Sequence, residues 1–218
     1  MKTKSKALLL TLCAVLLVAA SVLGTMAYLT STDKVENTFT VGNVAITLDE
    51  AKVTEDGKLV TPAERVKANN YKLMPGHTYT KDPTVTVKAG SESSYVRMKV
   101  TFTKANELDA IFAPNGADLT SIFNGYDAAN WIAKGNTKDT ENNTRTYEFW
   151  YKETVGAPAT ADVVLDALFD SITVPGTITN EQLATIAAMT ITVNAEAIQA
   201  DGFETADAAW AAFGAKTN

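Results

Sequence analysis

The feature that most constrains the fold is a strictly alternating segment from Tyr95 to Thr103. Every second residue in it is apolar, and these residues are Val96, Met98, Val100 and Phe102. A period of two places alternate side chains on opposite faces of a β-strand. One face then packs into a core while the other meets water, as in an antiparallel sheet. The segment therefore predicts a strand of such a sheet.

Shorter segments along the chain show the same period. Strands are predicted at 44–48, 84–87, 130–134, 145–154, 168–174 and 190–198, and a small hairpin with an Asp56-Gly57 turn at 53–60. Short helices are predicted at 61–64, at 181–188 after an Asn180 cap, and at 204–213 before Gly214, with an irregular insertion around 104–145. No helix alternates regularly with strands, so a parallel sheet is not indicated. The sequence predicts an all-β fold with a few short helices, arranged as a two-sheet antiparallel sandwich that is jelly-roll-like.

The first 27 residues carry the three parts of a secretory signal peptide. Lysines 2, 4 and 6 precede an apolar run over residues 7–23, and Thr25 and Ala27 stand three and one residues before a cut at Tyr28. Signal peptidases read this combination of a positive end, an apolar centre and a small-x-small triplet. The run also reaches the lower limit for a retained transmembrane anchor. The triplet favours cleavage, which predicts a mature single domain over residues 28–218.

Charge and cysteine content exclude two classes of protein. The chain has 19 basic and 25 acidic residues, and the leader holds three of the lysines and no acid. The mature surface is therefore expected to be acidic, without the positive charge that attracts the phosphates of nucleic acid. The single cysteine, Cys13, lies in the leader, so the mature chain is no disulfide scaffold. We expect a secreted protein that meets a membrane only through its signal peptide and that uses no cofactor.

No group of residues predicts catalysis. His77 is the only histidine and HExxH is absent, whereas a zinc hydrolase needs several nitrogen or sulfur ligands. The acidic run at residues 138–143 lacks the EF-hand spacing and is expected to be a solvated hairpin loop. Trp150, on the polar face of its strand, is either an interaction site or a side chain covered by the C-terminal helix. We expect no enzyme and no metal site.

The residues around the end of the leader resemble a known family. Gly24 to Ala27 is followed by Tyr28, Leu29, a stretch rich in Thr, Ser and Asp, and the motif N-x-F-x-x-G at residues 37–42. A second patch has L-M-P-G at residues 73–76 and K-D-P at residues 81–83. In these features the chain resembles the TasA/camelysin family of exported proteins, whose signal peptides are cut by a SipW-type signal peptidase. The resemblance is specific over residues 1–49 and extends to about residue 103.

The resemblance implies a jelly-roll subunit of an extracellular biofilm-matrix or cell-surface fibre of a Gram-positive bacterium. Growth of such fibres resembles donor-strand exchange, in which the freed N-terminal segment of one subunit pairs with an open sheet edge of its neighbour. The candidate donor strand carries Tyr28, Leu29, Val35 and Phe39. The same segment can instead complete the sheet of its own subunit. The implied partners are further copies of the chain and a SipW-type signal peptidase.

Two other functions stay open at this point. A monomeric cell-surface adhesin or ligand-binding module on the same sandwich would stay monodisperse and bind a ligand saturably. The camelysin name also implies a metallopeptidase, to which a mature chain with one histidine gives no support.

Overall fold

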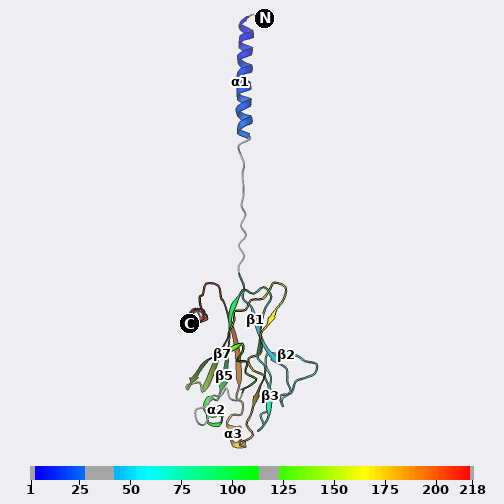
Figure 1. The fold of residues 1–218 in the computed structure, drawn as a ribbon, viewed down its shortest axis with the longest axis vertical. Helices are drawn as coiled ribbons and strands as arrows, with labels where there is room; N and C mark the ends of the chain where they lie inside the picture. The colour runs from blue at the N-terminus through cyan, green and yellow to red at the C-terminus, as the bar shows by residue number, and fades with distance from the viewer. Residues whose placement is uncertain (1–2, 28–41, 113–122, 217–218) are drawn as a thin grey trace. The chain divides into compact units, whose positions relative to one another are not determined.

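The computed structural model describes residues 3–27, 42–112 and 123–216, and the chain divides into two units, residues 1–41 and 42–218. The first unit contains helix α1 (Thr3–Ala27), which covers the apolar run of the predicted signal peptide. Among the described residues, we find no helix with the length and hydropathy that a membrane crossing requires. The second unit contains all the described strands and is mostly β (Figure 1).

The largest sheet is built around the alternating segment. Its four antiparallel strands lie in the order β11 (Ile191–Gln199), β5 (Ser94–Thr103), β8 (Thr144–Tyr151) and β7 (Trp131–Asp139). The four inward side chains predicted on β5 are all buried, which confirms that prediction. The hairpin of β7 and β8 is confirmed as well. Its loop is shorter than expected, because β7 continues to Asp139.

Two smaller antiparallel sheets contain the remaining strands. One has the order β2 (Arg65–Val66), β1 (Ile46–Ala51), β4 (Thr84–Val87) and β9 (Val163–Val164). The other has the order β3 (Thr78–Thr80), β10 (Ser171–Thr173) and β6 (Phe123–Asn124). Backbone bonds bridge the two sheets, with Lys81 N–H donating to the Asp170 carbonyl at 3.0 Å and Leu168 N–H donating to the Pro83 carbonyl at 3.1 Å. Residues 78–87 thus run along residues 163–173 from one sheet into the next.

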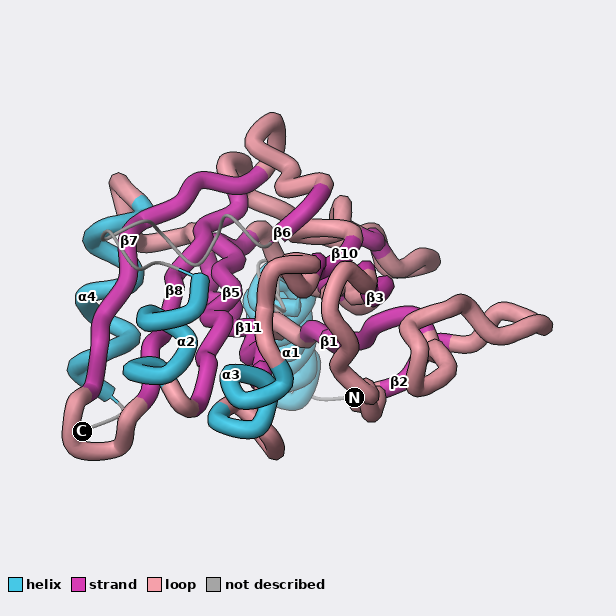
Figure 2. The backbone as a smooth tube through the Cα atoms, turned by 90° about the horizontal axis from the view of Figure 1, so that it is seen from below, coloured by secondary structure: helices cyan, strands magenta, loops and turns pink. Residues whose placement is uncertain are grey.

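All three sheets contribute to one hydrophobic core. Phe123 of β6 stacks on Phe169 with ring centroids 4.2 Å apart, and Phe102 of β5 lies 5.8 Å from Phe123. Trp131 of β7 is almost fully buried, and its Nε1 donates to the Asp166 carbonyl at 3.1 Å. Figure 2 shows the strands of the largest sheet side by side, with β1, β3 and β10 beyond them. The described strands form antiparallel sheets that close no barrel.

Among the described residues, three short helices accompany the sheets, and the sequence predicted their positions only in part. They are α2 (Ala105–Phe112), α3 (Asn180–Thr185) and α4 (Ala206–Lys216). Asp109 on α2 accepts hydrogen bonds from Lys138 on β7 at 2.7 Å and from Arg145 on β8 at 2.6 Å. The segment 104–145, treated above as an insertion, therefore supplies a helix, β6 and β7 to the fold.

Three local predictions were wrong or displaced. The helix predicted at residues 61–64 is absent, because the Glu64 carbonyl accepts from the Lys52 N–H and leads into β2. Helix α3 is capped by Thr179 and not by Asn180, because Thr179 and Gln182 form a reciprocal capping box. Helix α4 begins two residues later than expected, after a bond from the Ala208 N–H to the Thr205 hydroxyl, and continues through Gly214.

Candidate functional site

A groove of about 1160 Å³ lies between β1 and β11. Small-molecule sites typically enclose about 300–1,000 Å³, so this groove is large enough for a segment of polypeptide. Both of its strand walls and its floor are rich in apolar side chains, among them Ile46, Leu48, Tyr71, Ile172, Ile186 and Val193. Charged side chains, including Glu50 and Lys81, line it as well.

The β11 wall of the groove is a sheet edge without a strand partner among the described residues. Near the start of β11, Thr103 N–H donates to the Thr190 carbonyl at 3.1 Å. Beyond its end, Ala200 N–H donates to the Ser93 carbonyl at 2.8 Å. Bonded and non-bonded positions alternate in an antiparallel pair. The peptide groups that face away from β5 are therefore those of Ile191, Val193, Ala195, Ala197 and Gln199.

The β1 wall has a shorter open edge. Lys88 N–H donates to the Ala45 carbonyl at 2.9 Å, so the peptide groups of Ile46 and Leu48 face away from β4. The Leu48 carbonyl accepts a hydrogen bond from Lys67 Nζ, and Glu50 already pairs with β2. The edge of β11 is thus the longer one that could accept a further strand.

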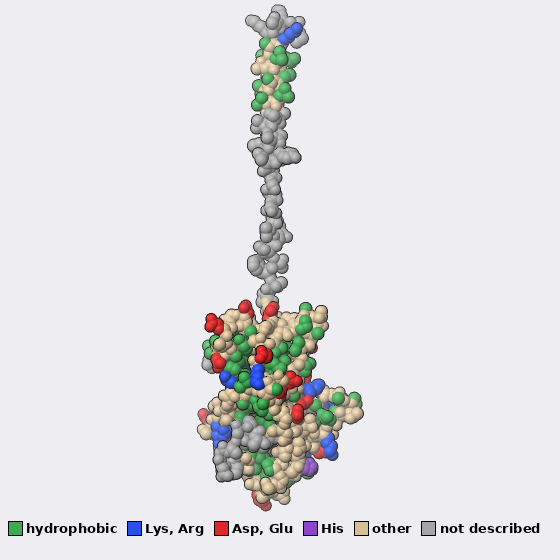
Figure 3. All heavy atoms as spheres, in the orientation of Figure 1, with side chains coloured by type: hydrophobic (Ala, Val, Ile, Leu, Met, Phe, Trp, Pro, Cys, Tyr) green, Lys and Arg blue, Asp and Glu red, His purple; other side chains and the backbone are tan. Residues whose placement is uncertain are grey.

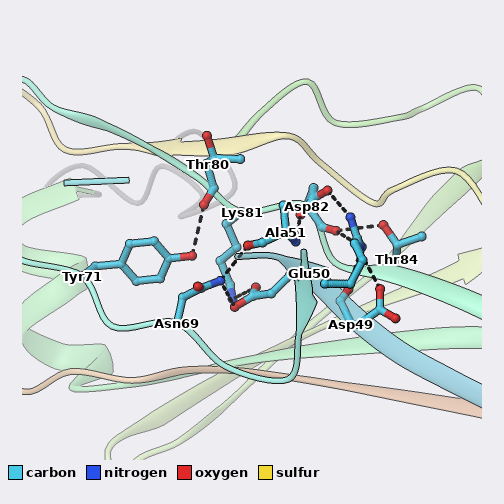
Figure 4. Close-up of polar contacts among 10 residues, drawn as sticks. Asp49, Glu50, Ala51, Asn69, Tyr71, Thr80, Lys81, Asp82 and Thr84 are labelled. Atoms are coloured by element: carbon cyan, nitrogen blue, oxygen red, sulfur yellow. Dashed lines mark hydrogen bonds and ion pairs between the residues drawn. The ribbon is translucent and has the colours of Figure 1, made fainter. Parts of the chain in front are cut away.

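A polar cluster with a buried ion pair lies at the groove, and we call it the Glu50 cluster: Glu50, Lys81 and the half-buried Asn69 (Figure 4). Lys81 Nζ lies 2.5 Å from Glu50 Oε2, and each of these two side chains is only 8% exposed. Asn69 Nδ2 donates to Glu50 Oε1 at 3.0 Å and to the Ala51 carbonyl at 2.9 Å. Val53 N–H donates to Asn69 Oδ1 at 3.0 Å. One carboxylate therefore bridges an amine and a carboxamide.

Arg65 joins the neighbouring backbone segments on the outer side of this cluster. Its Nε donates to Asp49 Oδ1 at 2.8 Å, and its Nη1 donates to Asp82 Oδ2 at 2.5 Å. Asp82 also accepts from the Ala51 N–H at 2.6 Å. These bonds fix β2 and the segment before β4 against β1, and so position the Glu50 cluster.

Tyr71 lies beside the Glu50 cluster, and the pKa of its hydroxyl reflects how poorly the cluster is solvated. Burial raises the pKa of Tyr71 well above its usual value, and the negative charge of Glu50 raises it further. The Tyr71 hydroxyl donates to the Thr80 carbonyl at 3.1 Å, and its ring meets Tyr79 edge to face at 5.7 Å. The cluster therefore lies in poorly solvated surroundings, where electrostatic interactions are stronger than in water.

The structure describes few of the site residues predicted from the sequence. Thr25 and Ala27 of the predicted cleavage site lie at the end of α1, and their side chains are not described. Tyr28, Leu29, Val35 and Phe39 of the candidate donor strand lie outside the described residues. Cleavage and strand donation therefore stay predictions.

The outer face of the largest sheet is covered by α4. Trp150 lies 6.1 Å from Trp210 of this helix, and Lys134 Nζ lies 4.0 Å from the centroid of the Trp150 ring. Beneath the helix, the Arg97 guanidinium is 4.2 Å from the Trp210 ring centroid. Of the two interpretations of Trp150, cover by the C-terminal helix is confirmed.

Within the residues that the structure describes, no three His, Cys, Asp or Glu side chains are placed to hold a metal ion. His77 is half-buried and follows the Pro75-Gly76 turn, with its N–H bonded to the Met74 carbonyl at 3.3 Å. Asp139 accepts from the backbone N–H groups of Glu141 and Asn142, both at 3.0 Å, and so stabilises the β7–β8 turn. On the face shown in Figure 3, acidic and basic side chains of the described residues are intermixed.

Sequence reasoning missed the Glu50 cluster, although one signal was present. Glu50 continues the apolar parity of Ile46 and Leu48, so its side chain points to the buried face of β1. An acid at such a position needs a buried partner. Nothing in the sequence names Lys81 as that partner, because the two residues meet only through tertiary structure.

Comparisons of this chain with protein-family models, with curated proteins and with solved structures find no match.

Proposed function

We propose that this chain is an exported structural subunit, not an enzyme, and that it assembles into extracellular or cell-surface fibres by strand addition. At each junction the N-terminal segment of one subunit, residues 28–41 freed by signal-peptide cleavage, pairs with the β11 edge of the next. The observation that carries this proposal is the β11 edge itself, which has no strand partner among the described residues and borders a groove of polypeptide size.

The proposal includes a finer description of the fold. We infer that the two smaller sheets act as one layer, so that residues 42–216 form a two-layer antiparallel sandwich of jelly-roll type. The backbone bonds between residues 78–87 and 163–173, and the shared core, support a single second layer. We propose that the added strand enters this sandwich at the groove between β1 and β11.

The free energy available to an added strand follows from the geometry of β11. Five outward-facing residues offer an N–H and a carbonyl each, and a net contribution of about 1 kcal/mol per hydrogen bond gives on the order of 10 kcal/mol. Apolar side chains that enter the groove add about 25 cal/mol per Å² of buried area. Part of this gain offsets the ordering of the donor segment. The burial of the donor's apolar side chains must therefore supply the free energy that makes the junction stable.

The donor segment has the side chains that this groove requires. Val35 and Phe39 have the same parity and would point together toward apolar groove residues such as Leu48 and Ile186. Tyr28 and Leu29 add apolar side chains at the freed end. At about 3.3 Å per residue, residues 28–41 extend to roughly 45 Å, which is long enough to reach a neighbouring subunit.

The family resemblance supports the same assembly. Subunits of the TasA/camelysin type are processed by a SipW-type signal peptidase, and such processing would free Tyr28 here. We propose secretion by this route, with the membrane involved only before cleavage. The alternative is a monomeric surface module whose groove binds a ligand. The size and mixed polarity of the groove support this second function.

One substitution separates these two functions. The Ala195 N–H faces away from β5, so Ala195→Pro removes a donor from the open edge and leaves the bonds to β5 in place. The proline ring also prevents a strand from approaching. We expect the mature Ala195→Pro chain to stay folded and monomeric, while mature wild type and the size-matched Ala195→Ser control form fibres visible by electron microscopy.

Deletion of residues 28–36 provides the complementary test on the donor side. Loss of the donor should leave a folded monomer by circular dichroism and size-exclusion chromatography. Fibres from the deletion variant, or from Ala195→Pro, would refute strand addition at this edge. A monodisperse wild type that binds a ligand saturably would establish the alternative.

A further inference from the structure

The Glu50 cluster brings together three groups that can react with one another. Lys81, between β3 and β4, supplies an amine, Asn69, after β2, supplies a carboxamide, and Glu50 on β1 bridges them through its two oxygens. The Lys81 and Glu50 side chains are each 8% exposed, and the half-buried Tyr71 lies beside them. A buried ion pair adds little stability by itself, because desolvation offsets its attraction. Stability alone therefore does not explain this cluster.

We propose that Lys81 and Asn69 become joined by an intramolecular isopeptide bond, with Glu50 as the proton-transfer group. The proposal concerns the wall of the groove and holds whether the groove accepts a strand or a ligand. It assigns a covalent modification to residues that lie within one subunit.

The reaction balances with the groups present. Glu50 takes a proton from the Lys81 ammonium, and the neutral amine attacks Cγ of Asn69. The new C–N bond forms, Glu50 passes protons from Nζ to the Asn69 amide nitrogen, and the old C–N bond breaks. The nitrogen leaves as ammonium, which carries away the charge of the lysine, and Glu50 is again a carboxylate. No oxidant or external co-reactant is required.

The hydrogen bonds place each participant in its role. Glu50 Oε2 accepts from Lys81 Nζ at 2.5 Å and Oε1 accepts from Asn69 Nδ2 at 3.0 Å, so the same carboxylate serves the nucleophile and the leaving group. Val53 N–H donates to Asn69 Oδ1 at 3.0 Å, where negative charge develops in the tetrahedral intermediate. The low solvation that raises the pKa of Tyr71 strengthens both interactions.

The product would close a covalent ring over residues 69–81. This ring contains Tyr71 and Leu73, which line the groove, and the Pro75-Gly76 turn. The bond would hold this wall of the groove in one position without any cysteine, which the chain lacks after its leader.

Peptide mapping of the full chain by mass spectrometry tests the bond. Trypsin cuts after Lys67, Lys72 and Lys88, and it cannot cut after a modified Lys81. We expect residues 68–72 linked to residues 73–88, at the summed peptide mass less one ammonia. Recovery of residues 68–72 and 73–81 as separate peptides of full mass from wild type would overturn the proposal.

Two variants identify the chemistry. Lys81→Arg keeps the cation beside Glu50 but cannot form the bond, so the linked peptide should fall to background. Glu50→Gln keeps the shape of the side chain and should also abolish the linked species, while circular dichroism reports whether each variant is folded. Ammonia loss that persists in Lys81→Arg would show a succinimide at an asparagine instead, and would refute the proposal even if Glu50→Gln failed to fold.

Discussion

Substitution of Arg97 by Met tests the polar contacts that dock α4 on the largest sheet. The Arg97 side chain is 9% exposed, with its Nε 2.5 Å from Glu196 Oε2 and its Nη1 3.0 Å from Glu148 Oε1. The Trp210 ring covers its guanidinium. Met keeps much of the apolar stem and removes the charge, so the variant leaves two carboxylates without their shared partner.

The magnitude follows from the exposure of those carboxylates. Removing one partner of a fully buried pair costs about 3–5 kcal/mol. Glu148 and Glu196 are 30% and 25% exposed, and Glu196 keeps Lys99 at 3.3 Å, so about 2 kcal/mol is expected here. Loss of the cation–π contact with Trp210 adds roughly 1 kcal/mol. The free energy of unfolding should fall by about 3 kcal/mol in all.

Urea unfolding followed by circular dichroism and tryptophan fluorescence measures this loss. The triple variant Arg97→Met, Glu148→Gln, Glu196→Gln should recover about 2 kcal/mol, because the two half-buried side chains at residues 148 and 196 are no longer charged. A loss below about 1 kcal/mol in Arg97→Met, or no recovery in the triple variant, would refute this account of α4 docking.

Two further predictions concern the turn at residue 57 and the anchoring of α2. Gly57 and Gly90 both have a positive φ (+80° and +77°), so substitution by Ala strains the backbone at either position. A Cβ at Gly57 would in addition lie 2.6 Å from Tyr79 Cα, whereas a Cβ at Gly90 would meet nothing within 4 Å. In thermal unfolding, Gly57→Ala should therefore lose about 2 kcal/mol more than Gly90→Ala, and equal losses would contradict this. Burial raises the pKa of Asp109, but hydrogen bonds from its basic partners on β7 and β8 outweigh burial and lower it. The ionised Asp109 carboxylate therefore stabilises the fold above its unfolded pKa near 3.9, and this stabilisation is lost as pH falls through its lower folded pKa. In Asp109→Asn, the free energy of unfolding should consequently fall less steeply as the solution is acidified.

The sequence predicted the long strands because their periodicity is local. On β5, four alternating apolar residues leave one arrangement in which all are buried, and the structure has it. Strands of two residues such as β2 (Arg65–Val66) and β9 (Val163–Val164) carry no such period. Their pairing, and with it the division into three sheets, depends on long-range contacts that no local pattern encodes.

Helix ends were predicted wrongly where tertiary contacts outweigh the helix propensity of the residues. Gly214 costs about 1 kcal/mol inside a helix, yet α4 continues through it. The packing of Trp210 on Arg97, and of Phe213 on Trp210 at 5.6 Å, holds this helix against the sheet. Neither contact can be read from the sequence, because Arg97 lies on a distant strand.

The groove could not be predicted from the sequence, because it also depends on contacts between residues far apart in the chain. Its walls, β1 and β11, are separated by most of the chain, and the open edge of β11 follows only from the register of its pairing with β5. The resemblance supplied a donor segment, and the structure supplied a candidate acceptor. Their pairing is the central claim.

Residue-resolved amide hydrogen exchange of β11, in monomer and in fibre, tests that claim most directly. In the monomer, Thr192, Asn194 and Glu196 bond to β5 and should be protected, while Val193 and Ala195 face the open edge and should exchange quickly. Assembly by strand addition predicts that Val193 and Ala195 become protected in fibres. If these two amides exchange as fast in intact fibres as in the monomer, the β11 edge is not the junction and the account is contradicted.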